Sequence, residues 1–335
     1  MIQLERSELM RILVTGGTGF TGTALVERLI ADGHEVVALD NKPGLSADAL
    51  HERGADVRIA SITDRESVDA ATAGVEVVYH LAAAFRELDV PESYYDEVNV
   101  GGTRLALEAA RRHGVRKFVY CSTCGVHGDV ADPPAGEEAP IAPADYYQRT
   151  KYEAEPIVAS FAEDFETAVV RPAAIYGPGD PERFHLIFKQ VAKGWFPMFG
   201  SGRTLYHPLY IDNLVDAFAR LLEPGVGAGS TYLIADEDYW SIEEIVRAVG
   251  RSIDVSVRIP HFPVLPVVAA GHVFETVCRP LGIRPPIFPR RVDWYRQNRA
   301  FDISRAKSEL GWTPRTGLDE GLRRTAAWYR ETGLL

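Results

Sequence analysis

The sequence has only 3 cysteines in 335 residues, which excludes a small secreted domain built on disulfides. It also lacks a basic block: 36 Lys and Arg stand against 47 Asp and Glu, a formal charge of −11. Its apolar runs, such as 264–271, are far shorter than the roughly 20 residues of a membrane-spanning helix. The N-terminus shows no signal-peptide order of charged, apolar and small residues. We therefore expect no nucleic-acid partner, no integral membrane segment and a cytoplasmic location.

What is present is an ordinary globular composition, with 46% hydrophobic and 25% charged residues. A chain of this length is expected to form about two structural units and to bury a full hydrophobic core.

The first 170 residues alternate short β-branched runs with amphipathic stretches of helical period. The expected strands are Arg11–Thr15, Glu35–Asp40, Asp56–Ile59, Val75–His80, Lys117–Ser122 and Thr167–Arg171. Strands that alternate with helices of this length form right-handed βαβ units. The sequence thus predicts an α/β fold with a doubly wound parallel sheet covered on both faces.

A glycine-rich loop, 15–22, follows the first expected strand and opens the first helix. Its glycines fit both G-x-x-G-x-x-G and G-x-G-x-x-G, and such a loop lets a helix N-terminus approach a pyrophosphate. Asp40 ends the second strand 18 residues after Gly22, where a carboxylate binds the adenosine ribose hydroxyls and repels the extra phosphate of NADP. Lys42 moderates that repulsion. The pattern favours NAD as the cofactor.

Beyond residue 172 proline and glycine become frequent and the expected elements are short and irregular. We expect a leader at 1–10, an NAD-binding Rossmann domain at 11–172, and a smaller, mostly helical substrate-binding domain at 173–335. The chain is free to cross back between the two domains.

Tyr147 and Lys151 are four residues apart in an expected helix, so both lie on one helical face. Two charges about 4 Å apart interact by roughly 4 kcal/mol at an effective dielectric near 20, or about three pKa units. An ammonium at that distance brings the phenol towards an acid/base that works near neutral pH. Ser122 and Thr123 end the fifth strand at the same sheet edge, with hydroxyls to hold a substrate oxygen.

These residues and several further motifs resemble one family, the extended short-chain dehydrogenases/reductases, also called the NAD-dependent epimerase/dehydratase family. The resemblance spans nearly the whole chain and rests on the following motifs in order: the 15–22 loop, His80-Leu81-Ala82-Ala83, Asn99-Val100-Gly101-Gly102-Thr103, Ser122-Thr123, Tyr147-x-x-x-Lys151, 171–180, Ile211-Asp212-Asn213 and 309–314. The sequence of residues 171–178 resembles that of the 3-beta-hydroxysteroid dehydrogenases and dihydroflavonol reductases more than that of the nucleotide-sugar epimerases.

The resemblance implies that Tyr147 is the general acid/base, that Lys151 lowers its pKa and binds the nicotinamide ribose, and that Thr123 holds the substrate oxygen with Ser122 beside it. The expected cofactor-binding residues are Gly16, Gly19, Phe20, Thr21, Gly22, Asp40, Asn41, Lys42, Ser61, Ile62, Leu81, Ala82, Ala83, Tyr147, Lys151 and Pro172. Ser61 stands where relatives carry the acid that meets adenine, and Asp64 is a rival partner. No metal is expected, because Cys121-x-x-Cys124 lies along a strand end.

Two positions bear on the substrate class, because nucleotide-sugar members of the family carry Asn and Arg donors for the diphosphate there. They look like Ala174 and Tyr206 here, although Arg203 is a possible substitute. We therefore favour oxidation or reduction of an apolar or carbocyclic secondary alcohol or ketone. The alternatives are a UDP-hexose 4-epimerase or dehydratase and a non-catalytic dinucleotide-sensing protein. A homodimer is expected from helices that pair in relatives.

Overall fold

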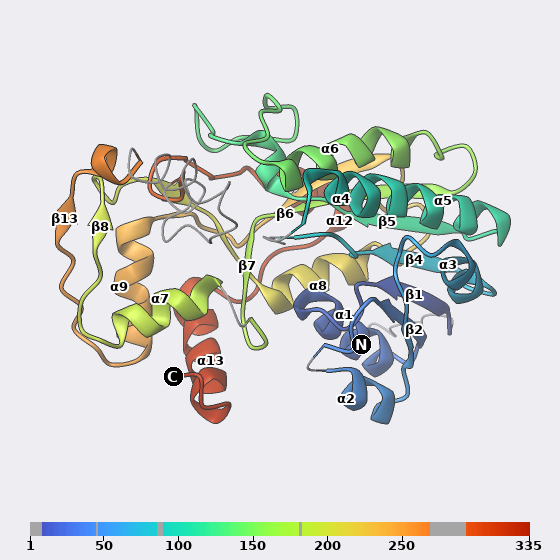
Figure 1. Ribbon diagram of the computed structural model, residues 1–335, viewed down its shortest axis with the longest axis horizontal. Helices are drawn as coiled ribbons and strands as arrows, with labels where there is room; N and C mark the ends of the chain where they lie inside the picture. The colour runs from blue at the N-terminus through green and yellow to red at the C-terminus, as the bar shows by residue number, and fades with distance from the viewer. Residues whose placement is uncertain (1–8, 45, 86–89, 181–182, 269–292) are drawn as a thin grey trace.

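A seven-stranded parallel sheet forms the centre of the molecule (Figure 1), in the strand order β11-β6-β5-β4-β1-β2-β3. The computed structural model describes residues 9–44, 46–85, 90–180, 183–268 and 293–335. The strands are β1 (Arg11–Thr15), β2 (Glu35–Asp40), β3 (Asp56–Ile59), β4 (Val77–His80), β5 (Lys117–Cys121), β6 (Glu166–Pro172) and β11 (Ser230–Ile234). The six predicted strands are β1 to β6, with ends that differ by no more than two residues.

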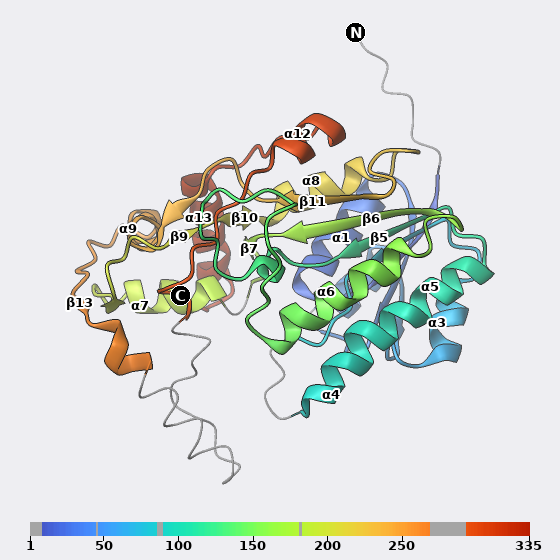
Figure 2. The same cartoon turned by 90° about the horizontal axis from the view of Figure 1, so that it is seen from above.

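Helices cover both faces of the sheet (Figure 2). One face carries α1 (Phe20–Ala31) and α8 (Ile211–Arg220), and the other carries α3 (Arg65–Thr72), α5 (Gly102–Arg112) and α6 (Tyr146–Ala159). Side chains alternate accordingly along β1: Ile12 and Val14 enter the core under α1, whereas Leu13 enters the core under α5. These two buried layers confirm the predicted doubly wound fold class.

Shorter elements complete this part of the chain. They are α2 (Ala47–Glu52), α4 (Glu92–Tyr95), the π-helical turn η1 (Asp96–Gly101) and the 3-10 turn η2 (Cys124–His127).

A second group of elements lies beside the sheet, on the left of Figure 1. Its helices α7 (Arg183–Val191), α9 (Ile242–Ser252) and α13 (Leu318–Glu331) pack against one another. Around them are short strand pairs, β7 (Ala174–Tyr176) with β10 (Pro208–Tyr210), β9 (Leu205–Tyr206) with β12 (Trp240–Ser241), and β8 (Met198–Phe199) with β13 (His261–Phe262). The helix α12 (Ser304–Leu310) contacts β11.

The chain returns to the sheet after residue 172. α8 packs on α1, and β11 pairs in parallel with β6, from Ser230 opposite Ala168 to Ile234 opposite Pro172. Residues from the second half of the chain therefore complete the sheet, because the chain crosses back to it after residue 172.

β1 lies between β2 and β4, so the strand order reverses direction at β1. In open parallel sheets a crevice for ligands forms at such a switch point, outside the carboxyl ends of the strands. The segments at this edge are the loops after β1, β4 and β5 and the N-terminal half of α6. Within the described ranges, no helix combines the length and apolar character that crossing a bilayer requires.

Candidate active site

The loop after β1 is packed too closely for side chains at two of its glycines. Gly16 has a φ of +71°, and a Cβ on it would lie 2.9 Å from the backbone nitrogen of Ala82. A Cβ on Gly22 would lie 2.0 Å from the Gly16 carbonyl oxygen. The loop is thereby pressed between the first turn of α1 and the segment after β4. Its shape fits a pyrophosphate, because the amides at the start of α1 have no partners within the helix.

Two cavities meet at this loop, sharing Gly16, Gly19, Leu81 and Ala83. The smaller, about 230 Å³, is lined by Thr15, Gly16, Gly19, Leu39, Asp40, Asn41, Lys42, Ala60, Ser61, Ile62, Leu81, Ala82, Ala83, Ala84, Tyr94 and Val98. All of the residues expected at the adenosine end are in this set.

Asp40 is held at the rim of the smaller cavity by the glycine loop. Its Oδ2 accepts a hydrogen bond from the Thr18 amide at 3.1 Å, and the Thr18 hydroxyl donates to the Lys42 carbonyl at 2.8 Å. The Ser61 hydroxyl is paired with that of Thr63 at 2.8 Å. Asp64 accepts from the Glu66 amide at the start of α3 and, unlike Ser61, does not line either cavity.

The larger cavity has a volume of about 530 Å³. Its lining includes the predicted residues Gly16, Gly19, Phe20, Thr21, Gly22, Leu81, Ala83, Ser122, Thr123, Tyr147, Lys151 and Pro172. Every residue of the predicted site therefore lines at least one of the two cavities. The two adjoining cavities together reach from the strand-end acid Asp40 to Tyr147, an arrangement that suits an extended dinucleotide.

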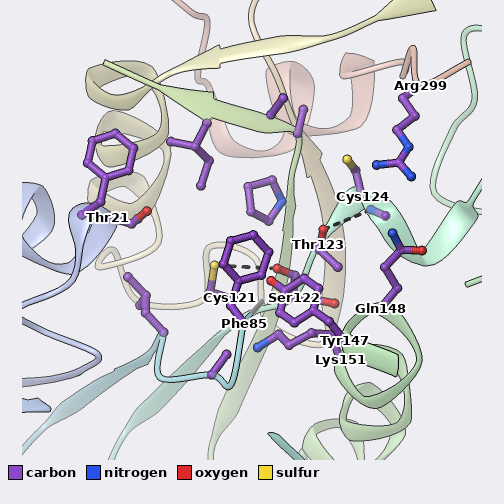
Figure 3. Close-up of a pocket in the computed structure, with 18 of the residues that line it drawn as sticks. Thr21, Phe85, Cys121, Ser122, Thr123, Cys124, Tyr147, Gln148, Lys151 and Arg299 are labelled. Atoms are coloured by element: carbon purple, nitrogen blue, oxygen red, sulfur yellow. Dashed lines mark hydrogen bonds between the residues drawn. The ribbon is translucent and has the colours of Figure 1, made fainter. Parts of the chain in front are cut away.

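α6 presents Tyr147, Lys151 and Glu155 on one face, because four residues make about one turn. The helix begins where Asp145 accepts a hydrogen bond from the Gln148 amide at 2.8 Å. Figure 3 shows Tyr147, Lys151 and Thr123 at one side of the pocket. The ring of Phe85 packs edge-on against Tyr147, with 4.8 Å between centroids.

Lys151 is only 1% exposed, and its Nζ lies 4.2 Å from the ring centroid of Tyr120. Burial lowers the pKa of Lys151 to about 8, against the opposing influence of Cys121 and the Glu155 carboxylate. The cation–π contact with the Tyr120 ring partly stabilises the charged ammonium of Lys151 in this buried position. Burial raises the pKa of the Cys121 thiol to about 11, so that thiol is protonated and unreactive at neutral pH.

The Ser122 hydroxyl is engaged by a buried carboxylate. It donates to Glu155 Oε1 at 2.5 Å, and Glu155 is in turn held by two hydrogen bonds from Arg171, at 3.0 and 2.6 Å. Both members of this ion pair are 7% exposed. Ser122 lines the larger cavity beside Thr123, and its role toward a substrate stays a prediction. Thr123 remains the strand-end hydroxyl in the cavity, where its Oγ1 accepts from the Gly125 amide at 3.1 Å.

A buried hydrogen-bond chain fixes the segment after β4. The Thr15 hydroxyl accepts from the Ala82 amide at 3.2 Å and lies 2.8 Å from His80 Nδ1, while His80 Nε2 lies 2.9 Å from the Thr103 hydroxyl. Burial lowers the pKa of His80 to about 3, so the ring is neutral. The Thr103 hydroxyl is donated to the Asn99 carbonyl at 2.6 Å, which leaves His80 Nε2 as the protonated nitrogen.

Among the lining residues of the larger cavity that sequence reasoning missed are Phe85, Gln148 and Arg299. Gln148 directly follows Tyr147 in the sequence, so its place near the cavity could have been inferred from that position. Arg299 has no local signal, because it comes from a segment 152 positions after Tyr147. Arg203, weighed as a diphosphate donor, is exposed and lines neither cavity.

A family model described as the NAD dependent epimerase/dehydratase family matches residues 12–235. Because the match covers more than half of the chain, this protein belongs to that family and is an enzyme of the epimerase/dehydratase type. The family's dependence on NAD confirms the predicted cofactor.

Individual relatives come from two substrate groups. The UDP-glucose 4-epimerase of Mycolicibacterium smegmatis is 32% identical over 339 residues, covering 96% of this chain and 99% of the relative. The 3-beta-hydroxysteroid dehydrogenase of Mycolicibacterium neoaurum is 31% identical over 350 residues, covering 97% and 93%. A solved UDP-glucose 4-epimerase with UDP-glucose, from Thermotoga maritima, has a TM-score of 0.77 and 26% identity, and covers 96% of this chain and 99% of that one.

Proposed function

We propose that the protein is an NAD-dependent oxidoreductase that interconverts a secondary alcohol and a ketone on an apolar or carbocyclic substrate. The observation that carries this proposal is that Tyr147, Lys151 and Thr123 line the same cavity as the glycine loop. A phenol, an ammonium and a hydroxyl at the carboxyl edge of a dinucleotide-type sheet are the groups that such a reaction needs.

In the oxidation, the Tyr147 phenolate takes the proton of the carbinol O–H, and Thr123 holds the same oxygen. NAD supplies the acceptor for the hydride that leaves the carbinol carbon. The carbon–oxygen double bond forms as that hydride departs, so one proton and one hydride account for both hydrogens lost. In the reduction, Tyr147 returns the proton to the carbonyl oxygen. Lys151 stabilises the phenolate by its charge.

For the cofactor, we propose that Asp40, Asn41 and Lys42 meet the adenosine ribose and that Ser61 and Ile62 meet adenine. The set is completed by Gly16, Gly19, Phe20, Thr21, Gly22, Leu81, Ala82, Ala83 and Pro172 along the pyrophosphate, ribose and nicotinamide. Ser122 takes a positioning role, since its hydroxyl is bound to Glu155.

The apolar substrate is supported by what lines the larger cavity at the two diphosphate positions. Ala174 offers no donor, and Tyr206, 3% exposed, stands where an Arg would provide a charge. The similarity to a 3-beta-hydroxysteroid dehydrogenase is consistent with this class. Nucleotide-sugar 4-epimerisation is the second candidate, because the Mycolicibacterium smegmatis epimerase is 32% identical over nearly its whole length.

We propose the division into a cofactor part and a substrate part as 11–172 and 173–335, with α8 and β11 of the later half joined to the cofactor part. The homodimer through α5 and α6, the cytoplasmic location and the absence of a bound metal stay predictions.

The decisive experiment is Tyr147→Phe, compared with Tyr146→Phe as a matched control. Tyr146 lies on α6 beside the site, stacks on Arg149 and does not line the larger cavity. We expect Tyr147→Phe to lower kcat by at least about 100-fold on an alicyclic secondary alcohol, in line with loss of general acid/base catalysis. NAD affinity by calorimetry is expected to change less than about threefold. Tyr146→Phe is expected to keep both.

Turnover of Tyr147→Phe at the wild-type rate would end the assignment. A parallel incubation with UDP-glucose separates the two candidates. Inversion at C4 without net NADH would replace the oxidoreductase by an epimerase.

A further inference from the structure

The larger cavity contains a cation to which no role has been given, the guanidinium of Arg299. Its backbone amide is anchored on the Leu205 carbonyl at 2.8 Å, and its Nη2 donates to the amide oxygen of Gln297 at 2.7 Å. Its Nε is buried and has no hydrogen-bond partner. Within the described parts of the chain, no carboxylate lies within 4.0 Å of this guanidinium. A half-buried guanidinium with unused donors is a ready site for an anion.

Gln148 supplies a second donor from α6, and its amide end faces the guanidinium of Arg299 (Figure 3). Its amide oxygen accepts from the Ala144 amide at 2.7 Å, which leaves the NH₂ group as its free end. The side chain is 6% exposed and packs over Gly125, where a Cβ would lie 3.0 Å from its Cγ. Gln148 is therefore held in place by packing and by one hydrogen bond, with its donors aimed into the cavity.

The acids of the same cavity are already engaged. Asp145 accepts from the amide of Gln148 at 2.8 Å, and Asp180 accepts from the amide of Phe184 at 3.2 Å, both at helix starts that offset a negative charge. Asp293 also lines the cavity and takes part in an interaction of its own. Arg299 thus has no carboxylate partner among the residues that the structure describes.

We propose that Arg299 and Gln148 bind a carboxylate of the substrate, close to the reacting carbinol. The inference rests on the proposed function and names its substrate class: an apolar hydroxy acid. Gln148 follows Tyr147 directly, and the residue it packs on, Gly125, is two positions after Thr123. The bound anion therefore lies near the proton-transfer groups. A single planar guanidinium matches the two oxygens of a carboxylate.

A nucleotide diphosphate is the other source of anionic oxygens, and the cavity fits it less well. It carries more charge than one guanidinium neutralises, and the two family donor positions are Ala174 and Tyr206. Arg203, the other candidate cation, is exposed and lies outside the cavity lining.

The test is calorimetric binding to the NAD-saturated protein, with adamantane-1-carboxylate and its neutral isostere adamantane-1-carboxamide as probes. We expect the carboxylate to bind at least about 10-fold more tightly than the amide, as charge-assisted hydrogen bonds predict. Arg299→Met is expected to reduce this preference to within about twofold, and Arg299→Lys to an intermediate value. Arg296→Met, an exposed arginine three residues earlier, is the matched control and is expected to keep the full preference.

Equal binding of the two probes, binding of neither, or an unchanged preference in Arg299→Met overturns the proposal. UDP is the third probe: if it binds more tightly than the carboxylate and loses affinity in Arg299→Met, the anion is a diphosphate and the carboxylate assignment is wrong. Tyr147→Phe separates this inference from the proposed function. It is expected to keep the carboxylate preference even where it loses turnover, whereas an active Tyr147→Phe variant refutes the proposed function alone.

Discussion

Two buried lysines show how differently the same side chain acts at different positions. Lys117 is 0% exposed, but its ammonium donates to the carbonyls of Glu223 and Val226 at 2.7 and 2.9 Å and pairs with Glu166 at 2.9 Å. Among the described residues no acceptor receives a hydrogen bond from Lys151, which has the face of Tyr120 instead. A buried charge without hydrogen-bond partners costs stability. Lys151 therefore lines the cavity at a cost in stability.

We predict that Lys151→Met raises the free energy of unfolding of the cofactor-free protein at pH 7, by on the order of 1–3 kcal/mol. The reason is that folding lowers the pKa of Lys151 from 10.5 to about 8. Below pH 8 the buried, charged ammonium therefore destabilises the folded state. That cost shrinks as pH rises from 8 towards 10.5, because the folded protein then carries the neutral amine. Urea denaturation at pH 7 and pH 9.5 measures both effects.

Lys117→Met is the matched control for this prediction. It removes a partner from two buried carbonyls and is expected to destabilise the protein by about 2–4 kcal/mol. If Lys151→Met destabilised the protein as much as Lys117→Met does, the ammonium of Lys151 would have partners that the geometry does not reveal.

At the scale of elements, one carboxylate links β11, α8 and the segment before α13. Asp236, just after β11, accepts from the Tyr210 amide at 2.9 Å and from Asn213 Nδ2 at 2.7 Å. Asn213 Oδ1 in turn accepts from the amides of Arg315 and Thr316, at 2.9 and 3.1 Å. The other Asp236 oxygen is buried and has no hydrogen-bond partner. Burial raises the pKa of Asp236 to about 7, despite the two hydrogen bonds that oppose it.

We predict that Asp236→Asn removes a pH dependence of stability between pH 4 and pH 8. Because folding raises this pKa from 3.8 to about 7, the wild type gains stability from proton uptake that is complete below pH 4 and lost as pH rises through 7. The Asn variant keeps the oxygen that accepts from Tyr210 and is uncharged. Relative to wild type it is expected to gain on the order of 2–4 kcal/mol of unfolding free energy between these pH values.

Chemical denaturation across the pH range gives the comparison, with Glu237→Gln as the control. Glu237 is the exposed neighbour and pairs with Lys307 at 2.7 Å. Parallel pH profiles of wild type and Asp236→Asn would show that Asp236 does not take up a proton in this range.

At the scale of the whole molecule, the cofactor part and the substrate part share one core. A single cluster of buried side chains runs from Leu25 of α1 and Val14 of β1 through Phe218 of α8 to Ile245 of α9 and Leu322 of α13. β11 is hydrogen-bonded to β6 along its whole length. Two parts of a chain that share such a core are expected to unfold together.

We predict a single cooperative thermal transition, in which the calorimetric and van't Hoff enthalpies agree. NAD at about 100 times its Kd is expected to stabilise the whole protein by about 2.7 kcal/mol and to shift that transition as one. Scanning calorimetry with and without NAD makes the measurement. Two resolved transitions, of which NAD moves only one, would show that the parts unfold separately.

Local sequence patterns predict much of the fold and of the candidate site. The alternation of Ile12, Leu13 and Val14, the glycines of the 15–22 loop and the four-residue spacing of Tyr147 and Lys151 each act within one element or one turn. Local rules are sufficient for these features, because strand and helix periods decide which side chains share a face. The six strands, the loop and the face of α6 were therefore predictable.

The rest depends on residues that meet only after folding. The return of β11 to the sheet edge, the turning of the Ser122 hydroxyl to Glu155, and the arrival of Arg299 opposite Gln148 join segments that are 33 to 151 positions apart. No local pattern encodes such distances, since burial and pairing are properties of the packed core. The sequence by itself thus determined the class of enzyme and the placement of Tyr147 and Lys151 on one face of α6. Only the tertiary structure decided that the Ser122 hydroxyl binds Glu155 and that Arg299 reaches the larger cavity, because both arrangements join segments far apart in the sequence.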